Sequence, residues 1–85
     1  MVSTYIATFY AHIGAVRFNK LQKELGNESR MMPVPRSLSS SCGTCVQYSC
    51  EVPIPEVAMT DEIEQIVLLN RSEDGSITYT SIPIN

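Results

Sequence analysis

The N-terminal part of the chain changes its hydrophobic period once, and this change restricts the fold more than any other feature. Residues 3–10, STYIATFY, are rich in β-branched and aromatic side chains, which is typical of a buried strand. Residues 12–25 then follow a helical period that places Gly14 and Phe18 on one face. Gly26 follows directly and suits the left-handed position at which many helices end.

Hydrophobic spacing also indicates the secondary structure of the segments after residue 26. Ile63, Ile66 and Val67 have helical spacing. Asp61 and Glu62 precede them, and the dipole of a helix favours negative charge in its first turn. The alternation in TCVQYSCEV instead indicates a half-buried strand. The elements that we expect after the first helix are a strand at 29–34, a strand at 44–52, a helix at 61–70 with Thr60 as its N-cap, a turn at 71–75 and a strand at 76–82.

The order strand–helix–strand–strand–helix–strand predicts an α+β fold. The economical arrangement is a ferredoxin-like βαββαβ sandwich, in which two helices cover one face of an antiparallel sheet. Residues 1–85 are expected to form one domain, because a chain of 85 residues is too short for two. The first two strands are parallel in this topology. We therefore expect His12 and the loop at 35–43 at the same end of the sheet, together with the turn at 71–75.

Composition argues against several classes of protein. Hydrophobic residues make up 44% of the chain and charged residues 18%, which is typical of a globular domain. The net charge of −3 argues against nucleic acid as a partner, because phosphate binding requires a basic surface. No apolar run is long enough to span a bilayer, and the N-terminus lacks the positive charges of a signal peptide. We therefore expect a cytoplasmic protein that does not bind membranes.

The segment between the second and third expected strands, residues 35–43, is about twice as long as a usual hairpin loop, and unusually long loops are often functional. Its glycine permits backbone conformations that other residues avoid, and successive backbone N–H groups in such a turn can bind an anion. Serine hydroxyls and an arginine add further polar groups. The candidate anion-binding residues are Arg36, Ser39, Ser40, Ser41 and Gly43.

Three cysteines lie within nine residues, Cys42, Cys45 and Cys50. Their odd number and close spacing do not resemble a secreted disulfide framework. Cys42 lies in the loop, close in sequence to Arg36 and close to His12 in the expected topology. A cation or a helix N-terminus stabilises a thiolate. Cys42 is therefore a candidate nucleophile or carrier of a sulfur-type atom, with His12 as its base or orienting group. The alternative is that Cys42 only fills a turn.

Cys42 and Cys45 have CxxC spacing, which suggests thiol redox chemistry. In thioredoxin-like proteins, however, this motif opens a helix, whereas here it opens a strand. A structural zinc site needs four ligands, and Cys50 faces away from Cys45 along the expected strand. We therefore expect no metal and no cofactor, and we interpret Cys50 as a core residue.

The segment PVPRSLSSSCG, residues 33–43, resembles the small family first described as a domain of unknown function (DUF3343) and later as putative Se/S carrier protein-like. The similarity extends through YIATFYAHIGAVRFNKL and MMPVPR, and more weakly through the C-terminal elements. The resemblance implies a carrier of sulfur or selenium that holds the atom as a persulfide or selenopersulfide on Cys42. It also implies donor and acceptor proteins for that atom, and a carrier or accessory role rather than an enzyme with turnover.

Three hypotheses stay open on the sequence. The first is carriage on Cys42, and Cys45, which departs from the family's motif, could then release the atom by forming a disulfide with Cys42. The second is a small thiol redox protein that uses Cys42 and Cys45. The third is a non-catalytic module whose serine-rich loop binds an anion, or whose sheet edge pairs with a second subunit in a homodimer.

Overall fold

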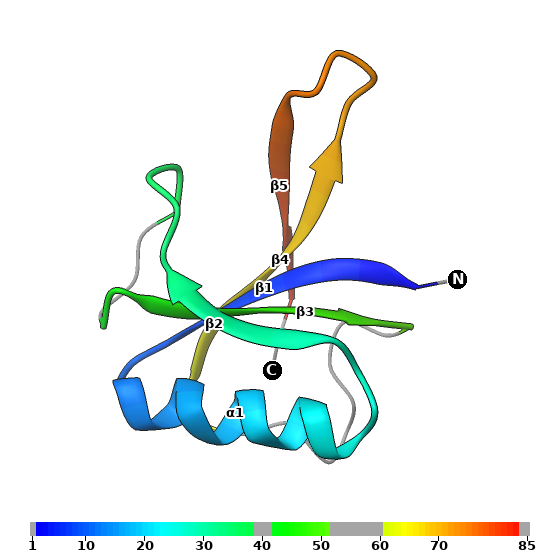
Figure 1. Ribbon diagram of the computed structural model, residues 1–85. Helices are drawn as coiled ribbons and strands as arrows, with labels where there is room; N and C mark the ends of the chain where they lie inside the picture. Colours follow the sequence, from blue (N-terminus) through cyan, green and yellow to red (C-terminus); the bar gives the residue numbers. More distant parts are fainter. Residues whose placement is uncertain (1, 39–41, 52–60, 84–85) are drawn as a thin grey trace.

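The computed structural model describes residues 2–38, 42–51 and 61–83. Figure 1 shows an antiparallel sheet with the one helix of these residues packed against it. The sheet has five strands in the order β2-β3-β1-β4-β5. The elements are, in chain order, β1 (Ser3–Phe9), α1 (His12–Glu24), β2 (Ser29–Pro33), β3 (Thr44–Cys50), β4 (Ile63–Arg71) and β5 (Ile77–Ile82).

Helix α1 covers one face of the sheet, where it contacts β1, β2 and β3. The hairpin of β4 and β5 extends away from the helix (Figure 1). Within the described residues, no helix is long and apolar enough to cross a membrane.

The expected α+β class and antiparallel sheet are confirmed, but the ferredoxin-like sandwich with two helices is wrong. Residues 63–71, expected to be largely helical, form strand β4. Its register with β1 shifts between Thr8 and Phe9. The shift places Ile63 and Ile66 in one core cluster on the helix side, although they are three residues apart. In a regular strand, residues three apart lie on opposite faces. The irregularity puts both isoleucines on the same face, which is the pattern that their spacing would give in a helix.

The end of the sheet that carries His12 also differs from the expectation. Strand β4 runs antiparallel to β1, with Ile63 beside Phe9 and Leu68 beside Tyr5. The turn at 71–75 therefore lies at the opposite end of the sheet from His12, and its predicted place beside the candidate site is wrong. The start of β4 lies there instead.

Two apolar clusters hold the sheet, one on each face. Strand β1 is buried on both sides, so it contributes to both clusters. Phe18 of α1 joins the sheet through aromatic contacts with Phe9 and Tyr48, at centroid distances of 5.3 and 5.0 Å. The helix-side cluster contains Tyr5, Ala7, Phe9, Ala15, Phe18, Val46, Tyr48, Cys50, Ile63 and Ile66. The far-side cluster contains Ile6, Cys45 and Val67, with Met32, Val34, Leu38, Leu69 and Tyr79 packed against them.

Helix α1 begins close to β4 and ends at Glu24, one residue before the predicted end, with Leu25 as its C-cap. Gly26 has a positive φ of 84° and its backbone N–H donates to the carbonyl of Lys23, which confirms the helix end. At the start, a Cβ on Gly14 would lie 2.9 Å from the Cβ of Glu62. Only glycine permits this close approach of the helix to the sheet, so Gly14 fixes the helix N-terminus against the start of β4.

Candidate functional site

Cys42 lies in the loop between β2 and β3, two residues before β3 begins. Its side chain is half-buried and packs against the helix-side cluster. Its Sγ donates a hydrogen bond to the backbone carbonyl of Thr44, at 3.3 Å. A thiol can donate this bond and a thiolate cannot, so the conformation belongs to the protonated side chain. Reaction as a nucleophile therefore requires loss of this bond together with the proton.

Gly43 forms the turn through which the loop enters β3. Its φ is +75°, a conformation that other residues rarely adopt, and a Cβ at this position would meet no atom within 4 Å. Its carbonyl accepts a hydrogen bond from the backbone N–H of Val34, at 3.2 Å. Glycine is therefore required here for its backbone conformation and not for lack of space.

The first part of the loop is anchored on the far side of the sheet. The backbone N–H of Leu38 donates to the carbonyl of Pro35 at 3.0 Å, which closes a turn. The side chains of Val34 and Leu38 both pack against the far-side cluster. Cys42, at the other end of the loop, packs on the helix side. Leu38 and Cys42 therefore pack on opposite faces of the sheet.

The predicted anion-binding residues are only partly placed. Arg36 is exposed in the turn that Leu38 closes, and Gly43 adjoins Cys42. Ser39, Ser40 and Ser41 lie outside the described residues. Their predicted role, and that of Arg36, stays a prediction.

His12 lies at the same end of the sheet as Cys42, which confirms the expected juxtaposition. It is the first residue of α1 and is exposed. Its Nδ1 lies 3.4 Å from the hydroxyl oxygen of Thr44. Thr44 is also the residue whose carbonyl accepts the bond from Cys42. His12 and Cys42 thus both interact with Thr44, His12 with its hydroxyl and Cys42 with its carbonyl.

Sequence reasoning missed Thr44. It is the first residue of β3 and pairs with Pro33 in the sheet, so its threonine type is explained by strand preference alone. The signal that could have identified Thr44 is its position directly after Gly43, two residues beyond Cys42. Strand alternation cannot show that a side chain at a strand end reaches a neighbouring helix.

The N-terminus of α1 lies at this end of the sheet, beside Glu62. Its N-cap, Ala11, makes no side-chain hydrogen bond to the helix, and the first turn contains no acidic residue. The N–H groups of a helix's first turn carry partial positive charge and stabilise nearby anions. Glu62 of the neighbouring chain segment forms a salt bridge with Arg17, at 2.9 Å, which ties the helix to the start of β4.

Cys45 does not share the environment of Cys42. It is fully buried in the far-side cluster, and its Sγ donates to the carbonyl of Pro33 at 3.7 Å. Burial, and secondarily the charge of Cys42, raises the pKa of the Cys45 thiol to about 11. Cys45 is therefore protonated at neutral pH and poorly suited to attack or to resolve a bond on Cys42.

Cys50 is buried in the helix-side cluster, as predicted. Asn27 approaches its Sγ at 3.6 Å with the side-chain amide that also donates to Gln22 at 2.8 Å. All three cysteines are thiols rather than disulfides. Among the described residues, no group of three or more His, Cys, Asp or Glu side chains is placed to hold a metal ion.

Comparison with known protein families matches residues 4–70 to the family described as putative Se/S carrier protein-like. No curated protein and no solved structure matches the chain. The matched region includes α1, β2, the Cys42 loop and β3, and all but one residue each of β1 and β4. The match therefore includes the candidate site residues His12, Cys42 and Thr44. The chain belongs to the putative Se/S carrier protein-like family.

Proposed function

We propose that the protein carries sulfur or selenium on Cys42, as a persulfide or selenopersulfide. The observation that carries this proposal is the setting of the Cys42 thiol, which is half-buried and shares Thr44 with His12 at the N-terminus of α1. The family description supplies the class of cargo. Donor and acceptor proteins for the atom are part of the proposal.

The loading step is an exchange at sulfur. The Cys42 thiolate attacks the outer sulfur of a persulfide on the donor. A bond forms between Cys42 and that sulfur, the bond to the inner sulfur breaks, and the donor leaves as a thiolate. The exchange needs no added oxidant or reductant. Unloading is the same exchange, in which an acceptor thiolate attacks the outer atom and Cys42 leaves. A selenium atom in the outer position follows the same course.

The chain's own residues would prepare Cys42 for this exchange. The N–H groups at the N-terminus of α1 would favour negative charge on Cys42 and on the persulfide. His12 would serve as base or orienting group for Cys42. Thr44 would hold His12 through its hydroxyl, whereas the bond of the Cys42 thiol to its carbonyl breaks when the thiolate forms. As part of the proposal, Gly43, Arg36 and the serines at 39–41 contribute to binding the carried anion.

The geometry favours carriage over the redox alternative. A disulfide between Cys42 and Cys45 requires two accessible sulfurs that can meet. Cys45 packs in the far-side cluster with no exposed surface, whereas Cys42 packs on the helix side. Release of the cargo by Cys45 would need this part of β3 to leave the sheet.

The test is labelling by a cysteine desulfurase that is supplied with radiolabelled cysteine. The labelled product is analysed without reductant and again after addition of a thiol. We expect thiol-sensitive label on the wild type and on Cys45→Ser and Cys50→Ser, and none on Cys42→Ser. Equal labelling of Cys42→Ser and wild type would contradict the proposal.

A further inference from the structure

Strands β1 and β4 separate at one end of the sheet. Their paired register ends at Tyr5 and Leu68. Each strand nevertheless continues with its other neighbour, β1 through Ser3 beside Cys50 and β4 through Arg71 beside Ile77. The sheet is therefore split between β1 and β4 at this end, while each strand stays paired with its other neighbour.

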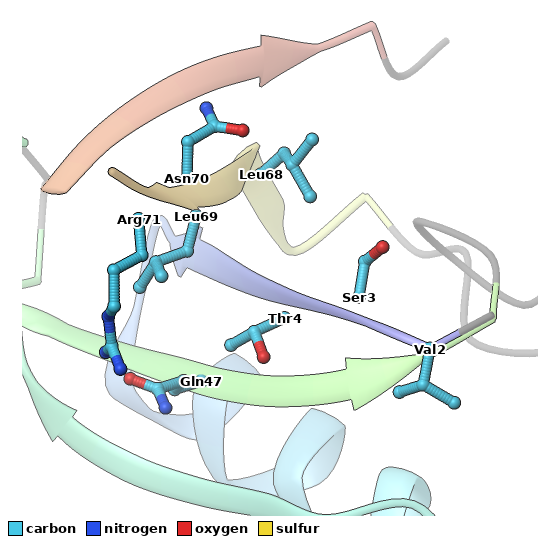
Figure 2. Close-up of a pocket in the computed structure, with 8 residues that line it drawn as sticks. All are labelled: Val2, Ser3, Thr4, Gln47, Leu68, Leu69, Asn70 and Arg71. Carbon is cyan, nitrogen blue, oxygen red and sulfur yellow. The ribbon is translucent and has the colours of Figure 1, made fainter. Parts of the chain in front are cut away.

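The split opens a cleft of about 510 Å³. This volume lies in the range of sites that bind small molecules. Figure 2 shows the side chains of Arg71 and Gln47 extending toward one another over it, with Leu69 between the strands and the Thr4 hydroxyl nearby. The lining residues are Val2, Ser3, Thr4, Gln47, Leu68, Leu69, Asn70 and Arg71.

The walls of the cleft are strand edges. A strand directs its backbone N–H and C=O groups alternately to its two neighbours. Beyond Tyr5 and Leu68, the described residues of β1 and β4 are not paired with each other, so some of these groups face the cleft. Such edges pair with an added extended chain, and this pairing is a common mode of peptide recognition.

The charge of the cleft indicates which kind of extended peptide it would bind. Arg71 is the charged residue among the lining residues, it is exposed, and within the described chain it has no salt-bridge partner. A guanidinium binds a carboxylate through two parallel hydrogen bonds. The amide of Gln47 and the hydroxyl of Thr4 add neutral polar groups.

We propose that this cleft binds an extended peptide segment of a partner protein, with a carboxylate side chain of that segment placed on Arg71. The inference goes beyond the carriage of sulfur or selenium. The cleft lies at the start of β1, whereas His12 and Cys42 lie beyond its end, so a partner held here leaves the thiol accessible.

The experiment is a titration of the nitrogen-labelled full chain with blocked hexapeptides, followed by NMR. The peptides alternate threonine and valine and carry one glutamate, placed at each position in turn. At least one peptide should give saturable shifts of the amides at 2–4 and 68–71. Arg71→Gln should weaken its binding by at least about fivefold, because a charge-assisted pair is lost. Arg30→Gln, which changes an exposed strand arginine outside the cleft, should leave binding unchanged.

Three results would overturn the proposal. One is the absence of saturable shifts at these amides with every peptide. Another is equal binding by Arg71→Gln and the wild type. The third is a shift of the same amides with protein concentration alone, because a second copy of the chain would then occupy the cleft. Cys42→Ser should bind the peptide as the wild type does, which separates this inference from the fate of the carrier proposal.

Discussion

The imidazole Nδ1 of His12 lies 3.4 Å from the hydroxyl oxygen of Thr44. Through the same threonine, whose carbonyl accepts the bond from Sγ at 3.3 Å, the helix N-terminus is linked to Cys42. One residue at the start of β3 therefore organises both groups that the carrier chemistry would use.

Replacing Thr44 by valine should lower the alkylation rate of Cys42 by a factor of about 2 to 10, because a single hydrogen bond is worth about 0.5–1.5 kcal/mol. Valine keeps the branched shape and the strand preference but removes the hydroxyl that holds His12. Thr44→Ser keeps the hydroxyl and should retain most of the rate. The rate is measured with iodoacetamide across a range of pH, on a Cys45→Ser, Cys50→Ser background. If valine and serine behave alike, the hydroxyl has no part in positioning His12.

Replacing Gly43 by alanine should destabilise the fold by about 1–2 kcal/mol, because its φ of +75° is unfavourable for a residue with a Cβ. Gly75, with φ of +88° and an equally open surrounding, offers a matched control at the far end of the sheet. Urea unfolding should show similar losses for both variants. Sulfur loading of Cys42 should fall only in Gly43→Ala, and an equal loss in Gly75→Ala would mean that loading reports stability alone.

Replacing Gly14 by alanine should destabilise the protein by about 1–3 kcal/mol, as overpacking does. Alanine normally stabilises the interior of a helix relative to glycine. Here its Cβ would lie 2.9 Å from the Cβ of Glu62 and 3.3 Å from a ring carbon of Phe9. Urea unfolding gives the sign directly. A stabilised variant would show that α1 and the start of β4 are not in this close contact.

Stability should fall as pH rises from about 9 to about 11, in part because of Cys45. Burial raises the pKa of its thiol from 9.0 to about 11 in the folded chain. The folded state therefore holds this proton more tightly, and the stabilisation is complete below the unfolded pKa and is lost as pH rises through the folded one. The loss is on the order of 2 kcal/mol.

The measurement is urea unfolding of the wild type and Cys45→Ala at both ends of this pH range. Burial also raises the pKa of Tyr48, with smaller contributions from the charges of Cys50 and Tyr5, and this effect is common to both proteins. The difference between their pH dependences therefore isolates Cys45. Identical pH dependences would show that the thiol titrates in the folded chain as it does in the unfolded one.

The first half of the fold could be predicted from the sequence because its local signals agree with one another. The strand at β1, the helix end at Gly26 and the alternation in β3 each follow from side-chain type and spacing. Together they place His12 and Cys42 at the same end of the sheet.

The second half could not be predicted because the apolar residues of β4 have the spacing that is typical of a helix. It is a central strand with apolar contacts on both faces, since Ile66 packs on the helix side and Val67 on the far side. The register shift beside Phe9 then adds Ile63 to the helix side. Periodicity alone cannot distinguish such a strand from a helix, because the spacing depends on a bulge that only the paired strand defines.

The candidate site shows the same division. Cys42 and His12 could be proposed from residue type and topology, whereas Thr44 and the different environments of Cys42 and Cys45 could not. Cys42 packs on the helix side of the sheet and Cys45 on the far side. CxxC spacing gives only the distance along the sequence, and it does not show in which environment each sulfur lies.

Fragment-ion mass spectrometry of the loaded protein tests the carrier proposal most directly. No lysine or arginine lies between Arg36 and Arg71, so trypsin leaves all three cysteines in one peptide and fragmentation must assign the added atom. After incubation with a cysteine desulfurase and cysteine, we predict one additional sulfur on Cys42, removed by a thiol reductant. An unmodified Cys42, or the added sulfur on Cys45 or Cys50 instead, would contradict the account.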